Sequence, residues 1–108
     1  MDAAQELSRK RRLVGAARSL LMLESGFAFG AKRVWNALDR LGDEYKRQHP
    51  AFGEFLRAIP TATPLGELRL LCTQELLLES DLALSKVELK FRQPLLKECR
   101  AVIDAYGI

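Results

Sequence analysis

The chain has 108 residues, 48% of them hydrophobic and 29% charged, and a formal net charge of +3. This composition excludes a disordered chain, and the length predicts one helical domain over residues 1–108 with a single core. The charge is uneven, because residues 1–50 carry ten Lys/Arg against six Asp/Glu while residues 51–108 carry seven against eight.

The first expected helix starts at Asp2, which forms a capping-box pattern, DAAQ, with Gln5. Its apolar residues recur at the helical period and predict one inward stripe: Leu13, Val14, Ala17, Leu20 and Leu21. Before the stripe, Arg9, Lys10, Arg11 and Arg12 occupy a full turn. Four consecutive cations cover all sides of that turn, so we expect it to protrude into solvent or to meet an acidic partner.

Ser25-Gly26 is the expected break before a second helix, whose predicted inward residues are Phe27, Ala31, Val34, Trp35, Leu38 and Leu41. Phe29 falls opposite that stripe, with Gly26 and Gly30 beside it. An exposed aromatic residue among small residues can anchor a protein partner. The alternative is that the bundle covers both faces of this helix. Gly42 frames its end, or the polar run DEYKRQ extends it to His49.

Residues 51–59 predict at most a short third helix, with one apolar face made of Phe52, Phe55, Leu56 and Ile59. The segment 59–64, IPTATP, is the clearest linker because its two prolines exclude regular hydrogen bonding. We expect Thr63 to cap a long leucine-rich helix that has Pro64 in its first turn. That helix would run through Leu65, Leu68, Leu71, Cys72, Leu76 and Leu78 towards Ser80-Asp81, which caps a continuation or a new helix.

The segment Lys86 to Arg92, KVELKFR, alternates polar and apolar residues as a half-buried strand does. It has no second strand to pair with, so we expect a helix instead. Leu84, Val87 and Phe91 then share one face, and Leu82 and Leu89 the other. Two apolar faces predict burial on two sides, either at the centre of the bundle or at a subunit interface.

The C-terminal region predicts the most regular helix, after a kink or restart at Gln93-Pro94. Its stripe comprises Leu95, Leu96, Cys99, Val102, Ile103 and Tyr106, and Gly107 suits a left-handed C′ position. The whole pattern therefore predicts an all-α fold. We expect one small bundle of four to six helices with a long, central, Leu-rich helix.

The sequence carries no recognisable catalytic pattern, and we expect no enzyme. His49 is the only histidine and precedes Pro50, which predicts a solvated turn residue. Cys72 and Cys99 form no CxxC motif, so a disulfide framework or zinc site is not indicated, and both are expected to be buried. No cofactor, membrane-spanning segment or signal peptide is expected. These features favour the cytoplasm.

The surplus of apolar helix faces predicts a non-enzymatic protein-binding module of adaptor, regulator or assembly-chaperone type, working as a homodimer. The candidate interface residues are Phe29, Leu77, Leu82 and Leu89. The alternative is a nucleic-acid-binding protein that uses its basic N-terminal helix. The candidates for that role are Arg9, Lys10, Arg11, Arg12, Arg18, Lys32 and Arg33.

Overall fold

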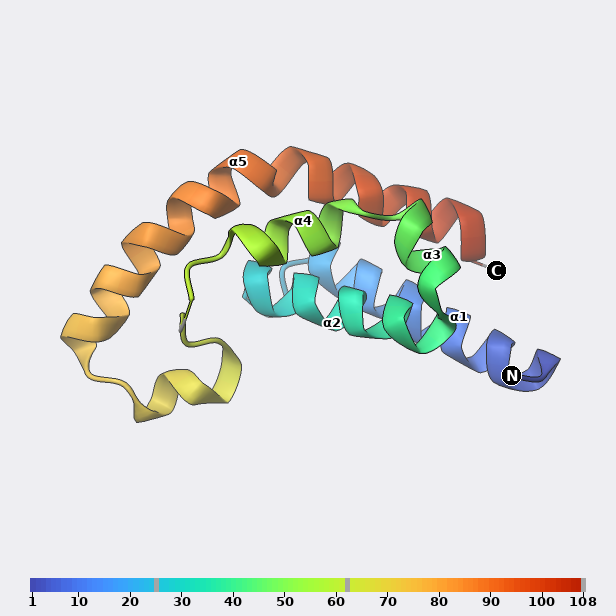
Figure 1. Ribbon diagram of the computed structural model, residues 1–108, viewed down its shortest axis with the longest axis horizontal. Coiled ribbons are helices and arrows are strands. Elements are labelled where there is room, and N and C mark those ends of the chain that lie inside the picture. The colour runs from blue at the N-terminus through green and yellow to red at the C-terminus, as the bar shows by residue number, and fades with distance from the viewer. Residues whose placement is uncertain (25, 62, 108) are drawn as a thin grey trace.

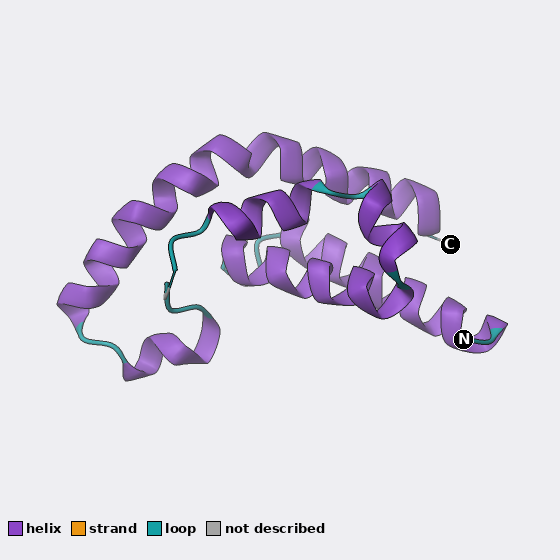
Figure 2. Ribbon diagram, viewed as in Figure 1, coloured by secondary structure: helices purple, strands orange, loops and turns teal. Residues whose placement is uncertain are grey.

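A computed structural model describes residues 1–24, 26–61 and 63–107 of the chain. Its helices, in chain order, are α1 (Ala3–Leu21), α2 (Phe27–Leu41), α3 (Asp43–Gln48), α4 (Ala51–Ala58), the 3₁₀ helix η1 (Gly66–Leu71) and α5 (Gln74–Tyr106). Figure 2 shows these helices joined by loops, with no strand in the described ranges. The all-α prediction is confirmed.

Helix α1 begins as its sequence predicts. The backbone N–H of Gln5 donates to Asp2 Oδ1 at 2.8 Å, and the Asp2 N–H donates to Gln5 Oε1 at 3.2 Å. This capping box satisfies two backbone donors that the helix itself leaves unpaired. The predicted inward stripe is also confirmed, with Leu21 only partly buried. The break expected at Ser25-Gly26 lies partly outside the described residues, and Gly26 is the N-cap of α2.

The core lies where α1 packs along both α2 and α5, while α4 packs on α2 and α5 (Figure 1). Its largest side chains are Phe52 and Phe55 of α4, both fully buried. The Phe55 ring lies 5.4 Å from Phe27 and 5.6 Å from Phe91, centroid to centroid. Edge-to-face and tilted rings at these distances stabilise each other beyond the area they bury. The short helix predicted for this segment is therefore confirmed, and its stability comes from packing.

Helix α5 is one continuous helix of 33 residues. It includes Lys86–Arg92, so the helical interpretation of that alternating segment is confirmed. It also runs unbroken through Ser80-Asp81 and past Pro94, where the sequence left a new helix or a restart open. Pro94 is exposed and Figure 1 shows a curved α5. A curved helix tolerates the loss of the backbone hydrogen bond that proline cannot donate.

The predicted start of the long helix at Thr63-Pro64 is wrong. Leu65 is extended and Gly66 adopts a left-handed conformation with φ of +59°, which cannot continue an α-helix. A side chain at Gly66 would meet the ring of Phe29, because an added Cβ would lie 2.8 Å from Phe29 Cε2. The helix starts instead at Gln74, and Thr73 caps it by accepting from the Leu76 N–H at 3.2 Å.

Two smaller expectations about helix ends have different outcomes: one of the two alternatives at Gly42 is confirmed, and the prediction at Gly107 is wrong. Gly42, with φ of +123°, ends α2, and the polar run after it forms the separate helix α3 instead of extending α2. Gly107 has φ of −68° and is extended, so the predicted left-handed C′ glycine is wrong. Its N–H still caps the helix by donating to the Ile103 carbonyl at 2.7 Å.

One part of the chain projects from the bundle. Residues 66–82, comprising η1, the turn that follows it and the first turns of α5, are here called the arm (Figure 1). The radius of gyration is 14.5 Å, where a compact domain of this length would have about 13 Å. The longest extent, 48 Å, is nearly twice the other two, 26 and 24 Å. The arm lies at one end of this long axis in Figure 1, and the N-terminus lies at the other.

Candidate functional site

The arm carries the largest concentration of exposed leucines in the described residues. Their side chains are between 47% and 85% exposed: Leu68, Leu70, Leu71, Leu76, Leu78 and Leu82. Leu89, about one helical turn beyond Ser85 on α5, is 78% exposed. Single exposed leucines are ordinary. This many on one segment and the helix that continues it make the segment a candidate interaction surface.

An ion pair and a packing contact hold the arm in place, and its leucines stay exposed. The Arg69 guanidinium of η1 donates to both carboxylate oxygens of Asp81 on α5, at 2.7 and 3.0 Å. This pairing raises the pKa of Arg69 and lowers that of Asp81. A bidentate arginine-carboxylate pair fixes orientation better than a single contact does. The ring of Phe29 against Gly66 makes a second attachment.

Exposed residues on α5 follow a regular 3,4 spacing that starts within the arm and continues past it. They are here called the α5 seam and comprise Glu75, Leu78, Leu82, Ser85, Leu89 and Arg92. Alternating steps of three and four residues place side chains along one line of a helix, as in a coiled coil. The opposite side of α5 faces the core through Leu84, Val87 and Phe91. Helix α5 is therefore covered on one side only within a single chain, where the sequence predicted burial on both.

The four predicted interface residues lie in different environments. Leu82 and Leu89 are exposed on the α5 seam, whereas Leu77 is half-buried. Phe29 is 37% exposed and is partly covered by the arm at Gly66.

The sequence misplaced two leucines. Leu68 and Leu71 were expected on one long helix together with Leu78, but they lie on the separate helix η1. All three are exposed. Leu70 was not singled out at all, because nothing local distinguishes it from its buried counterparts. The i, i+4, i+11 spacing of Leu78, Leu82 and Leu89 was a usable signal for the seam.

The basic residues predicted for nucleic-acid binding are separated into groups by the fold. Arg9 and Arg12 of α1 meet Arg33 and Arg40 of α2 in a cavity of about 580 Å³ between the two helices. This cavity is here called the arginine groove, and its remaining lining is Gly15, Ala16, Ser19, Asn36 and Ala37. Arg40 was missed by the sequence reasoning. Its spacing of seven from Arg33, with Asn36 between them, was the available signal.

The other basic candidates lie outside the groove. Lys32 is exposed on α2 and does not line the groove. Arg11 and Arg18 line a separate hollow beside Tyr106 at the end of α5. Lys10 forms an ion pair with Glu6 at 3.3 Å. The basic turn therefore does not protrude as a whole, since Arg9 and Lys10 are partly covered. Lys10 instead meets an acidic group, Glu6, which is the other possibility that the sequence left open.

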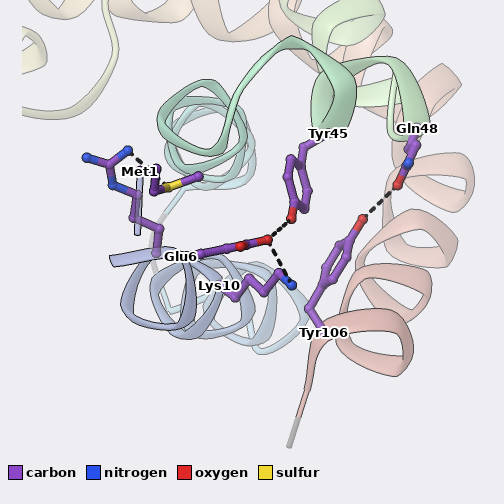
Figure 3. Close-up of polar contacts among 7 residues, drawn as sticks. Met1, Glu6, Lys10, Tyr45, Gln48 and Tyr106 are labelled. Atoms are coloured by element: carbon purple, nitrogen blue, oxygen red, sulfur yellow. Dashed lines mark hydrogen bonds and ion pairs between the residues drawn. The ribbon is translucent and has the colours of Figure 1, made fainter. Parts of the chain in front are cut away.

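Lys10 belongs to a polar cluster that joins α1 to α3 (Figure 3). The Tyr45 hydroxyl donates to Glu6 Oε1 at 2.6 Å, and the Lys10 ammonium lies 5.9 Å from the centroids of the Tyr45 and Tyr106 rings. The hydrogen bond from Tyr45, followed by the contact with Lys10, lowers the pKa of Glu6. The Lys10 side chain therefore makes structural contacts within the chain, with a carboxylate and two aromatic rings.

His49 is buried, with only 6% of its surface exposed, so its prediction as a solvated turn residue is wrong. Its Nδ1 lies 2.5 Å from Glu98 Oε1, and its Nε2 lies 2.9 Å from the Tyr106 hydroxyl. That hydroxyl in turn donates to Gln48 Oε1 at 3.0 Å (Figure 3). These bonds link the end of α3 to α5, and each ring nitrogen of His49 has a partner from α5.

The two cysteines lie in different environments. Cys99 is fully buried as predicted, and burial raises the pKa of its thiol to about 12. Cys72 is only half-buried in the arm, contrary to the expectation that both would be buried. The described residues contain no group of three His, Cys, Asp or Glu side chains that could hold a metal ion.

None of the helices in the described ranges combines the length and the apolar character needed to cross a bilayer. Comparison with other proteins adds no assignment, since no protein-family model, curated protein or solved structure matches this chain.

Proposed function

We propose that this chain is a non-enzymatic protein-binding module, of adaptor, regulator or assembly-chaperone type, that acts as a homodimer through its arm and α5 seam. The observation that carries the proposal is the exposure of the leucines on residues 66–82 and at Leu89. Burying one such side chain completely contributes about 1.5–3 kcal/mol. A second polypeptide that covers several of them gains enough to offset the entropy lost on association.

The α5 seam favours a second copy of the same chain as the occupant. In an antiparallel pairing of two seams about a two-fold axis between Leu82 and Ser85, Leu78 of one copy faces Leu89 of the other. The same axis places Glu75 opposite Arg92 of the second copy, at both ends. A two-fold interface must complement itself in this way.

The charge beside the seam is compatible with this pairing. Asp81 flanks Leu82, and its charge is already matched within the chain by Arg69. Two copies can therefore approach without bringing two unpaired Asp81 carboxylates together. The complementary ends, Glu75 and Arg92, are both exposed and contribute orientation more than affinity.

The proposal includes a cytoplasmic location. It is supported by the two cysteines, which are unpaired in the structure. Proteins of oxidising compartments generally form disulfides, whereas cytosolic proteins keep their thiols reduced.

Sedimentation equilibrium tests the dimer. The wild type should be dimeric at high micromolar concentration, and Leu82→Glu should be monomeric, because the substitution places two carboxylates at the centre of the seam. Leu7→Glu is the matched control: Leu7 is an exposed leucine of α1 and its substitution should leave the dimer intact. A wild type that stays strictly monomeric contradicts the proposal.

A charge exchange tests the orientation. Glu75→Arg should weaken the dimer, since it places two arginines opposite each other at both ends of the seam. The double variant Glu75→Arg/Arg92→Glu should restore wild-type association. Restoration supports the antiparallel pairing, whereas additive weakening contradicts it.

A further inference from the structure

The arginine groove is a second feature of the surface, formed by other residues than those of the arm and the α5 seam. Helix α1 contributes Arg9, Arg12 and Ser19 to it, and α2 contributes Arg33, Asn36 and Arg40. Small residues line the rest of the groove. An added Cβ at Gly15 would meet no atom within 4 Å, which leaves the space above that residue open.

The positive charge of the groove is not neutralised by the lining residues, none of which is acidic in the described part of the chain. The nearest acidic side chains along these two helices have other partners. Glu6 accepts from Tyr45 and pairs with Lys10, and Asp39 pairs with Lys46 at 2.6 Å. Four guanidinium groups in one hollow repel each other, and an anion placed among them relieves this repulsion.

One arginine is held in position before any ligand arrives. The guanidinium of Arg9 donates to the main-chain carbonyl of Arg40 at 2.8 Å, across the interface between α1 and α2. A guanidinium has five N–H donors, so this bond leaves others for an anion. Ser19 and Asn36 add neutral hydrogen-bond donors of the kind that contact phosphate oxygens.

We infer that the arginine groove binds the phosphodiester backbone of a duplex nucleic acid. Arginine pairs with phosphate in bidentate geometry, which suits this ligand class. From Arg9 to Ser19 the groove follows about 15 Å of α1, at about 1.5 Å per residue. A single free phosphate fills only part of that length, whereas a duplex presents one negative charge per about 1.7 Å of its axis.

The groove favours a duplex over a single strand and backbone contacts over base contacts. Proteins that bind single strands stack bases on aromatic side chains. The described lining of the groove has no aromatic residue. The binding is therefore independent of base sequence and dominated by counterion release.

Fluorescence anisotropy with labelled short DNA and RNA duplexes measures this binding as a function of salt. Four arginine-phosphate contacts give a slope of log K against log salt of about −3.6, or about −0.9 for each contact. Arg12→Gln, Arg33→Gln and Arg40→Gln should each reduce the slope to about −2.7 and weaken binding about eightfold at ~0.1 M salt.

The controls separate the groove from general basicity. Arg57→Gln removes an equal charge from an exposed position on α4, away from the groove, and should leave the affinity unchanged. Gly15→Glu should weaken binding with every arginine intact, whereas the uncharged Gly15→Gln of the same size should weaken it less. Circular dichroism confirms that each variant is folded, and the glycine variants avoid any change to Arg9 and its bond to Arg40.

Three results overturn the inference. One is equal loss of affinity for Arg57→Gln and the groove variants, which indicates attraction by net charge alone. Another is equal binding of polyglutamate, which reassigns the groove to an acidic protein. The last is a preference for vesicles of anionic phospholipid over both duplexes. Binding of DNA and RNA duplexes with the predicted slopes supports it, and their relative affinities distinguish the two sources of phosphate.

Discussion

Leucine side chains are mostly buried or half-buried in the bundle and mostly exposed in the arm. Leu38 and Leu95 are fully buried in the bundle, whereas Leu70 and Leu71 are each 85% exposed in the arm. In the bundle, every apolar helix face has another helix within reach, because α1, α2, α4 and α5 surround one core. In the arm, η1 is short and is tied to α5 by the Arg69–Asp81 ion pair. Composition therefore does not decide burial here, because the leucines of the arm stay uncovered within a single chain.

One cysteine lies in each region, Cys99 in the bundle and Cys72 in the arm. Their reactivity with an alkylating agent should show the largest difference between the two regions. Burial raises the pKa of the Cys99 thiol from 9.0 to about 12, which reduces its thiolate fraction about a thousandfold. Only the thiolate reacts with alkylating agents. Iodoacetamide should therefore label Cys72 in the native protein and should label Cys99 only after unfolding. Equal labelling of both in the native state contradicts the placement of Cys99 in the core.

Side-chain truncation separates the regions by stability. Phe55→Ala should lower the free energy of unfolding by about 3–5 kcal/mol, because it opens a cavity between Phe27 and Phe91. Leu70→Ala should change it by no more than about 0.5 kcal/mol in the monomer. Urea unfolding monitored by circular dichroism, with Leu82→Glu as the monomeric background, measures both. Similar losses for the two variants would remove the distinction between bundle and arm.

The smallest expected effects come from two glycines with different surroundings. Gly15→Ala in α1 should raise the free energy of unfolding by about 0.5–1 kcal/mol, because alanine favours a helix and the added Cβ meets nothing. Gly66→Ala should lower it by about 1 kcal/mol or more, because φ is +59° there and the Cβ would approach the Phe29 ring. Urea denaturation of both variants gives the two signs. Stabilisation by Gly66→Ala contradicts the packing of the arm on Phe29.

The sequence predicted those features that depend on residues close together in the chain. The capping box at Asp2 and Gln5 depends on residues three apart, and it forms as expected. The inward stripes of the first two helices follow from periodicity alone. Thr63-Pro64 is an equally good local pattern, yet it starts no helix. Gly66, two residues later, adopts its left-handed conformation against Phe29, a contact that local patterns do not contain.

The same distinction applies to the candidate sites. His49 looked like a turn residue because its partners, Glu98 and Tyr106, are about fifty residues away. The arginine groove depends on the register between α1 and α2, which brings Arg9 to Arg40 across 31 positions of sequence. The sequence did predict surplus apolar faces on the leucine-rich segment. It did not show which of those leucines the fold leaves exposed.

Amide hydrogen exchange at low and high micromolar concentration tests the central claim most directly, because it reports on the arm and the bundle in one experiment. We predict that protection of residues 74–90 rises with concentration, as a second copy covers the α5 seam, while protection of residues 95–106 stays constant. Protection of residues 74–90 that is the same at every concentration, in a protein that remains monomeric, would contradict the account.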